Sequence, residues 1–229
     1  RYCTDGESHT SLCLAAARQA LERGGVAPGE IGICLVATVT PDFLSPAAAC
    51  LLQRELGLRE DTVCFDLNAA CSGFVYSLHT AQCLLAAAER KYGLVVGAEV
   101  LSRLTDFSDR STCVLFGDGA GAALVEWRAD YPSLHAVLGC RGDDQVLYAP
   151  GVNTPAPSLI HMEGQPVFRF AVEAVPACVR QVLDKAGLEP EAVDRFCRAY
   201  GEAVGAGQLD PLLLYRAGYI VGNLSRKAD

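Results

Sequence analysis

Cys71 is the residue whose type and setting best suit nucleophilic chemistry. It lies between a strand-like run that ends at Asp66 and a helix-like run that begins at Ser72. A cysteine at the start of a helix is close to the free N–H groups of the first turn, whose field favours the thiolate, and the thiolate is the nucleophile. The residues around it are small and would let a substrate carbonyl come close: Ala69, Ala70, Ser72 and Gly73.

Two other interpretations of Cys71 stay open at the level of sequence. Free cysteines are among the most buried residue types, so Cys71 could be a structural core residue. It could also be a redox-sensing thiol, which needs a resolving cysteine nearby. Cys64 and Cys50 are the candidates for that partner along the chain.

Composition and charge bound the class of protein. The chain has 229 residues, 51% of them hydrophobic, and a mean hydropathy of +0.21, which is typical of a globular protein with a sizeable core. No apolar run is long enough to span a bilayer, so we expect no membrane association. The net charge of −8 argues against a nucleic-acid partner, and an acidic partner would need a local basic patch.

Eleven cysteines are scattered through the chain, and no two have the C-x-x-C spacing of a zinc ribbon or a thioredoxin-like motif. Reduced thiols of this kind are typical of a cytoplasmic protein. The first residues lack the apolar core of a signal peptide. Because the sequence begins with Arg1 and not with methionine, we expect the native start to lie further upstream.

Helix-like and strand-like periodicities alternate along the chain, which predicts an α/β layered fold. Ser45 followed by Pro46 predicts the N-cap and first residue of a helix, and Gly24 and Gly25 predict the end of the first helix. Pro176 predicts a bend in the last helix. The predicted helices cover 10–23, 46–58, 72–90 and 167–186, and the predicted strands cover 31–40, 62–66, 92–99 and 191–196.

The Gly-rich segment 117–121 predicts a tight turn between two strands at 113–116 and 122–126. A phosphate-binding loop is the other role for such glycines, but this segment lacks the Lys and Ser/Thr of a P-loop and precedes a strand. Further along, the pattern predicts two short strands within 134–150 and a loop over 151–166.

Three stretches together resemble the β-ketoacyl-acyl-carrier-protein synthase III family of thiolase-like condensing enzymes. They keep the order and spacing of that family, and the resemblance covers residues 4 to 196. They read FDLNAACSGFVYSLHTAQ at 65–82, KYGLVVGAEVLSRLTDFSDRSTCVLFGDGAGAALVE at 91–126 and HMEGQPVFRFAV at 161–172.

The resemblance implies a thiolase-like fold with two similar α/β halves, each with a mixed sheet between layers of helices. We therefore expect an N-terminal half over 1–127, which carries the nucleophile, and an incomplete C-terminal half over 128–229. The resemblance also implies a cytoplasmic homodimer. It implies that the family's first strand and a tryptophan segment that stacks on CoA precede residue 1.

The same resemblance implies roles for particular residues. Cys71 matches the nucleophile that accepts the acyl group of an acyl-CoA, and Arg110 matches an arginine that contacts the CoA moiety. Gly164 and Phe168 match residues that line the channel for the pantetheine arm, and Leu147 matches a position near the acyl pocket. No cofactor or metal is implied, because coenzyme A enters as the thioester of the substrate.

The implied reaction initiates fatty-acid synthesis in two stages. The Cys71 thiolate attacks the acyl-CoA thioester, of the acetyl-CoA type, and CoA is released. Malonyl-acyl-carrier protein then loses carbon dioxide, and its carbanion attacks the acyl-enzyme to give 3-oxoacyl-carrier protein. Negative charge develops on the malonyl thioester oxygen and needs preplaced donors. The family takes these donors from a His-Gln-Ala-Asn motif and a Gly-Asn-Thr-Ser motif.

Neither of these two motifs occurs in this sequence. Where the histidine motif is expected, after the predicted strand 191–196, the chain reads CRAYG at 197–201, which predicts a deletion there. Two hypotheses follow: an acyltransferase that is acylated but condenses poorly or not at all, and a non-catalytic fragment or partner subunit of the same fold. The four histidines lie elsewhere and are interpreted as non-catalytic: His9, His79, His135 and His161.

Overall fold

The computed structural model describes residues 2–131, 133–151 and 159–195, and the chain divides into two compact units. Unit 1 comprises Arg1–Tyr131 and Arg141–Phe168, and unit 2 comprises Pro132–Cys140 and Arg169–Asp229. The structure describes only part of each unit. The division into halves at 127 and 128 stays a prediction, and so does the deletion at 197–201, which lies outside the described residues.

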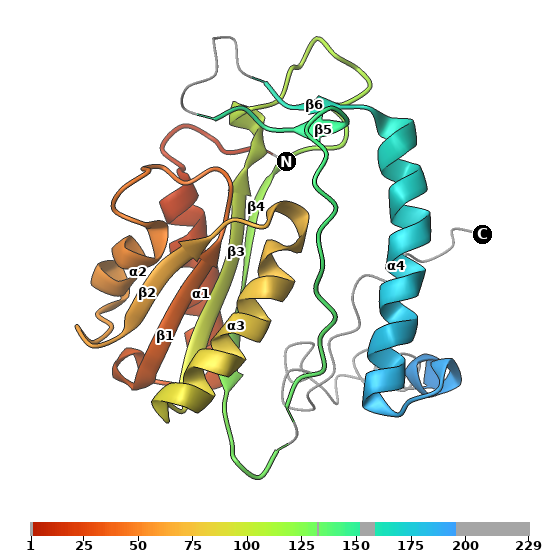
Figure 1. The fold of residues 1–229 in the computed structure, drawn as a ribbon. Coiled ribbons are helices and arrows are strands. Elements are labelled where there is room, and N and C mark those ends of the chain that lie inside the picture. The colour runs from red at the N-terminus through yellow and green to blue at the C-terminus, as the bar shows by residue number, and fades with distance from the viewer. Residues whose placement is uncertain (1, 132, 152–158, 196–229) are drawn as a thin grey trace. The chain divides into compact units, whose positions relative to one another are not determined.

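Unit 1 is built on a mixed four-stranded sheet in the order β2-β1-β3-β4 (Figure 1). β1 pairs in parallel with both β2 and β3, and β4 is antiparallel to β3. An α/β fold with a mixed sheet is therefore confirmed for this part of the chain. The strands are β1 (Ile31–Ala37), β2 (Val63–Leu67), β3 (Tyr92–Val100) and β4 (Asp118–Glu126).

Helices cover both faces of this sheet (Figure 1). α1 and α2 pack on one face and α3 on the other, so β1 is buried along its whole length. This double burial explains why β1 reads as a continuous apolar run and not as an alternating one. The helices are α1 (His9–Gly24), α2 (Ala48–Leu56) and α3 (Gly73–Ala88).

Different residues of the central strands pack against the helices on the two faces of the sheet. Cys34 of β1 and Leu94 of β3 belong to one core cluster with the buried sides of α1 and α2. On the other face, glycine lets α3 come close to β3, because a Cβ at Gly97 would lie only 3.1 Å from the Phe74 ring. The spacing of α3 from the sheet therefore depends on the absence of a side chain at this position.

α1 extends one residue beyond each end of the predicted helix 10–23. Ser8 is the N-cap and accepts the N–H of Ser11 at 3.1 Å. Gly25 ends the helix in the left-handed conformation, with φ of 63°, and its N–H donates to the carbonyl of Glu22 at 3.2 Å. A left-handed C-terminal residue of this kind favours glycine, so the predicted helix stop is confirmed.

The start of α2 differs from the prediction. Ser45–Pro46 lies before the helix, whose N-cap is Ala47, and that residue has no side-chain hydrogen bond to the first turn. Asp66 at the end of β2 instead accepts the N–H groups of Ala48 and Ala49, at 2.7 and 2.9 Å. A local N-cap pattern could not reveal this acceptor, because it comes from a neighbouring strand.

Residues 118–121 of the Gly-rich segment belong to one continuous strand, so the predicted turn between two strands is wrong. Every residue of β4 pairs with β3, from Val100 with Asp118 to Tyr92 with Glu126. Residues 113–115 lie in turns before the strand, and Phe116 lies in neither a turn nor a strand. Glycine and alanine do not favour strands by themselves, so pairing with β3 decides the extended shape.

The region after β4 also differs from the prediction. Its strands are β5 (Leu147–Tyr148) and β6 (His161–Met162), which pair antiparallel. Only one of the two strands predicted within 134–150 is therefore present among the described residues, and β6 lies in the predicted loop. The last predicted helix is present as α4 (Gly164–Ala186), which begins at Gly164 and not at 167, and it contains Pro176.

Residues 190–195 are helical, so the predicted strand over 191–196 is wrong for its described part. Pro190 stands at the start of the helical segment, where its fixed φ and missing N–H are tolerated. The N–H of Ala192 donates to the carbonyl of Glu189 at 2.9 Å. Proline followed by glutamate and alanine is thus a helix start, which outweighs the short apolar pattern.

We expect that replacing Asp66 with alanine lowers the free energy of unfolding by about 1–2 kcal/mol, because two N–H groups at the start of α2 lose a charged acceptor. Urea unfolding followed by circular dichroism measures the change. Glu22→Ala on the exposed side of α1 is the control, with an expected change within about 0.5 kcal/mol. Equal effects of the two substitutions would contradict the capping role of Asp66.

Candidate active site

The three parallel strands bring their carboxyl ends to one edge of the sheet in unit 1. Ala37 at the end of β1 pairs with Leu67 at the end of β2 and with Gly97 near the end of β3. In open α/β sheets, ligands bind outside the carboxyl ends of the strands. The residues that follow β2 therefore lie at the edge where such proteins place their sites.

Cys71 lies in a short 3₁₀ turn, Ala70–Ser72, which joins β2 to α3. Its side chain is exposed and its thiol is free, so the interpretation as a buried core residue is wrong. A Cβ at Gly73, the first residue of α3, would lie 3.1 Å from the Ala37 side chain, so α3 begins close to the end of β1. The strand-to-helix turn expected for Cys71 is present, and its role as a nucleophile stays a prediction.

The backbone before Cys71 turns sharply. Ala70 has a φ of 45°, a left-handed conformation that costs an L-residue about 1–2 kcal/mol. The side-chain oxygen of Asn68 accepts the N–H of Ala70 at 3.3 Å, and the carbonyl of Ala69 accepts the N–H of Ser72 at 3.1 Å. These local bonds hold the turn, and strain of this kind gathers at functional sites.

The start of α3 lacks a cap of the kind that α1 and α2 have. Its N-cap residue, Ser72, makes no side-chain hydrogen bond to the first turn. The corresponding N–H groups of α1 bond to Ser8 and Asp42, and those of α2 bond to Asp66. No capping side chain therefore offsets the partial positive charge of the α3 N-terminus beside Cys71.

The redox interpretation finds little support in the position of the other cysteines. Cys64 pairs with Cys34 across β2 and β1, and its hydrogen bond with Cys34, together with burial, raises the pKa of Cys34. The sulfur of Cys50 lies 4.0 Å from the carbonyl oxygen of Cys64. Cys64 is three residues before the end of β2, about 10 Å along the strand from that end, and the turn with Cys71 begins only at Ala70. Since a disulfide needs Cα atoms within about 7 Å, Cys64 is not placed to resolve Cys71.

The loop between β3 and β4, the β5–β6 pair and the start of α4 adjoin one another in unit 1. The N–H of Ile160 donates to the carbonyl of Leu104 at 2.7 Å, and the N–H of Glu163 donates to the carbonyl of Val146 at 2.8 Å. These two bonds join segments that are far apart in the chain. The four residues expected to bind substrate come from these segments.

Arg110, Leu147, Gly164 and Phe168 are all exposed. Arg110 lies in the loop before β4, Leu147 in β5, Gly164 at the first position of α4 and Phe168 one turn later, with 67% of its surface exposed. The structure thus places the four on adjoining segments. Within the described ranges, no hydrogen bond or ion pair joins any of them to Cys71, and their binding roles stay predictions.

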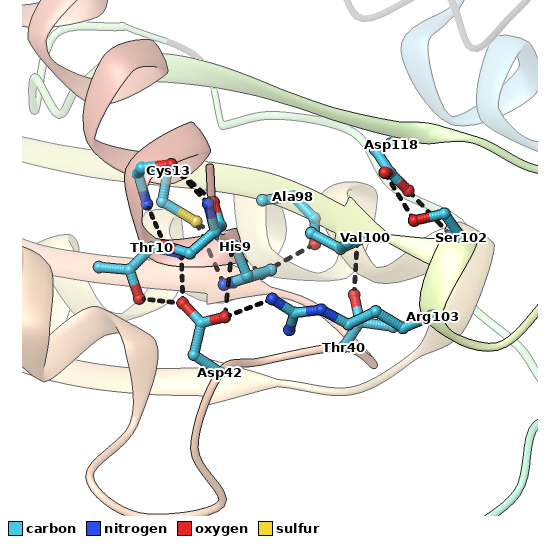
Figure 2. A network of polar contacts seen from close by, with 12 residues as sticks. His9, Thr10, Cys13, Thr40, Asp42, Ala98, Val100, Ser102, Arg103 and Asp118 are labelled. Carbon is cyan, nitrogen blue, oxygen red and sulfur yellow. Dashed lines mark hydrogen bonds and ion pairs between the residues drawn. The ribbon is translucent and has the colours of Figure 1, made fainter. Parts of the chain in front are cut away.

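Carboxylates fasten the loops at this edge of the sheet, as Figure 2 shows. Asp42, after β1, accepts the N–H groups of His9 and Thr10 at 3.3 and 2.8 Å and forms an ion pair with Arg103 at 2.8 Å. Burial acts to raise the pKa of Asp42, but the hydrogen bonds from Thr10 and Arg103 hold it well below its ordinary range. One carboxylate therefore joins the start of α1 to the segments that follow β1 and β3.

Two further carboxylates act in the same way and were not identified from the sequence. Glu99 accepts the N–H of Val39 at 2.9 Å, and Asp118 accepts the N–H groups of Cys3 and Ser102 at 2.7 and 2.9 Å. Donor and acceptor are between 16 and 115 positions apart in these pairs. No local pattern in the sequence indicates contacts over such separations.

His9 is completely buried at the start of α1 (Figure 2). Its Nε2–H donates to the carbonyl of Ala98 at 3.1 Å, which gives the ring a structural role in joining α1 to β3. Burial lowers the pKa of His9, while the bond to Ala98 and the charges of Asp42, Glu99 and Asp66 act in the opposite direction. The net effect favours the neutral imidazole in the folded protein.

Two kinds of site are not found in the part of the chain that the structure describes. No group of three or more His, Cys, Asp or Glu side chains is arranged to hold a metal ion. No helix there combines the length and the apolarity needed to cross a bilayer.

A family model described as 3-oxoacyl-[acyl-carrier-protein (ACP)] synthase III matches residues 65–142 of this chain. This range includes Cys71 and Arg110. A curated relative, the β-ketoacyl-[acyl-carrier-protein] synthase III of Clostridium acetobutylicum, is 40% identical over 204 residues. The match covers 85% of this chain and 62% of the relative, so the chain spans less than two thirds of that protein.

Solved structures of the same kind of protein are also similar. The β-ketoacyl-[acyl carrier protein] synthase III of Thermus thermophilus has a TM-score of 0.76 and 38% identity, over 83% of this chain and 61% of that chain. The 3-oxoacyl-[acyl-carrier-protein] synthase III of Aquifex aeolicus has a TM-score of 0.71 and 37% identity, over 83% and 60%. The similarity therefore extends over most of this chain.

The buried His9 predicts that stability falls in mild acid. The unfolded chain takes up a proton on this ring near its ordinary pKa of 6.5, whereas the folded chain does so only at lower pH. The free energy of unfolding should therefore be lost progressively as pH drops below about 6.5. Urea unfolding at pH 7, 6 and 5 measures this for the unchanged chain and for His9→Gln, which keeps a donor for Ala98 but does not titrate. As pH falls, the free energy of unfolding of the unchanged chain should decrease more than that of His9→Gln. The same decrease in both chains would contradict the assignment to His9.

Proposed function

Because the chain belongs to the 3-oxoacyl-[acyl-carrier-protein] synthase III family, we propose that Cys71 accepts an acyl group from an acyl-CoA of the acetyl-CoA type. The observation that carries the proposal is the exposed, free thiol in a sharp turn at the carboxyl edge of the sheet. The thiolate attacks the thioester carbonyl, a new thioester to Cys71 forms, and the bond between the acyl carbon and the CoA sulfur breaks. CoA leaves as a thiolate and takes up a proton from water.

The start of α3 supports this step electrostatically. Its first-turn N–H groups favour negative charge nearby, both on the thiolate and on the oxyanion of the tetrahedral intermediate. α1 and α2 begin at the same edge, but carboxylates take up the donors at their starts. The helix start beside Cys71 has no capping side chain, and only backbone carbonyls of the preceding turn accept the N–H groups of Ser72 and Gly73.

Arg110, Leu147, Gly164 and Phe168 would bind the CoA part of the substrate. The guanidinium of Arg110 makes no ion pair among the described residues, and a phosphate is a fitting partner for it. Leu147 and Phe168 expose 39% and 67% of their surface and suit the less polar pantetheine and acyl portions. Gly164 adds no side chain at the first position of α4.

Condensation with malonyl-acyl-carrier protein would be the second half of the reaction, and we propose that this chain carries it out poorly or not at all. The sequence has neither of the two motifs that would supply donors to the malonyl thioester oxygen. The expected homodimer and cytoplasmic location belong to the same proposal. The absence of the two motifs also supports the alternative of a non-catalytic fragment or partner subunit of this fold.

We expect that incubation with acetyl-CoA adds one acetyl group to the chain and that the Cys71→Ala variant gains none, since the thioester forms on that sulfur. Intact-mass measurement followed by peptide mapping detects the adduct. Cys50→Ser, which removes another exposed thiol, is the matched control and should be acetylated like the unchanged chain. Acetylation that persists in Cys71→Ala, or no acetylation of the unchanged chain, would argue for the non-catalytic alternative.

With malonyl-acyl-carrier protein present, we expect the rate of 3-oxoacyl-carrier protein formation to be at least about 100-fold below that of the Clostridium acetobutylicum relative, because loss of one oxyanion donor alone has an effect of this size. Mass spectrometry of the carrier protein measures the product. A rate comparable with that of the relative would show that other residues supply the donors.

A further inference from the structure

The loop between β3 and β4 contains the same local turn twice. Asp106 accepts the N–H and the hydroxyl of Ser108 at 2.8 and 2.6 Å. Three positions later, Asp109 accepts the N–H and the hydroxyl of Ser111 at 2.9 and 2.6 Å. The repeat is visible in the sequence as DFS followed by DRS, a pattern typical of Asx turns.

The middle residue of each turn is exposed, Phe107 in the first and Arg110 in the second. The second turn has additional anchors. The other oxygen of Asp109 accepts the hydroxyl of Thr112 at 2.6 Å, and Thr112 is only 3% exposed. The backbone carbonyl of Asp109 also accepts the N–H of Cys113 at 3.0 Å. Arg110 therefore projects from a segment whose two sides are fastened.

Asp109 does not pair with the adjacent Arg110. Its two carboxylate oxygens already accept three side-chain and backbone donors from Ser111 and Thr112, and these bonds lower the pKa of Asp109. The guanidinium of Arg110 thus has an anionic neighbour whose lone pairs are used by other donors. Within the described residues it forms no ion pair, so its charge is available to a ligand.

We propose that Asp109 is a positioning residue, which holds Arg110 in place to bind a phosphate group of the acyl-CoA substrate. The inference rests on the proposed function, because it takes CoA as the ligand that Arg110 meets. Asp109 acts only through the loop backbone and does not touch the ligand. An arginine on an ordered segment loses less conformational freedom on binding, which improves affinity without a new contact.

The test compares the affinity of coenzyme A for the full chain, for four single variants and for one double variant by titration calorimetry. Asp109→Ala should weaken binding about tenfold, the equivalent of one charge-assisted contact. Asp106→Ala, the matched control in the sister turn, should leave affinity unchanged. Asp109→Asn should bind better than Asp109→Ala, because its amide oxygen can still accept from Ser111. Pantetheine, which has no phosphate, should bind the chains alike.

The fourth variant, Arg110→Ala, tests whether Asp109 acts through Arg110. If it does, the double variant with Asp109→Ala should bind no more weakly than Arg110→Ala alone, because the two effects are not additive. Additive losses, an equal loss in Asp106→Ala, an unaffected Arg110→Ala or no binding of coenzyme A to the unchanged chain would each overturn the inference. Acetylation of Cys71 is measured separately, so failure of that chemistry with the affinity differences intact would refute the proposed function alone.

Discussion

The edge of the sheet that carries Cys71 depends on carboxylates that accept backbone N–H groups. Parallel pairing of β1 with β2 and β3 brings three strand ends together, and each is followed by a loop with donors to satisfy. Asp42, Asp66, Glu99 and Asp118 supply the acceptors. Each links segments that lie apart in the sequence, so the geometry of the whole edge follows from these few charged hydrogen bonds.

Against this background, the start of α3 differs from the starts of α1 and α2. Carboxylates meet the first-turn N–H groups of α1 and α2, whereas Ser72 offers no side-chain acceptor to α3. The left-handed Ala70 and the close approach of Gly73 to Ala37 define the turn that exposes Cys71. The helix start without a capping side chain is thus the one beside an exposed thiol.

The two halves of a condensing reaction make different demands on the protein. Acyl transfer needs a nucleophile, a stabilised oxyanion and a bound thioester, and the proposed function assigns residues of unit 1 to these roles. Carbon–carbon bond formation additionally needs donors for an enolate-like oxygen, and the sequence contains neither of the motifs that would provide them. Since the chain spans 62% of the Clostridium acetobutylicum relative, membership of the family does not by itself imply the complete reaction.

Local patterns in the sequence were sufficient for several elements. The apolar run of β1, the left-handed glycine after α1 and the turn with Cys71 can each be recognised from residues that are neighbours in the chain. The predicted helix 167–186 was also identified, although α4 begins slightly earlier, at Gly164.

Other features depended on partners that are remote in sequence. Asp66 decides where α2 begins, and pairing with β3 draws the glycines of β4 into one strand. The sequence alone therefore determined the buried strands, the helix stop and a reactive-looking cysteine between strand and helix. Only the tertiary structure decided which helix starts are capped and which loops adjoin, because those hydrogen bonds form between groups that folding brings together.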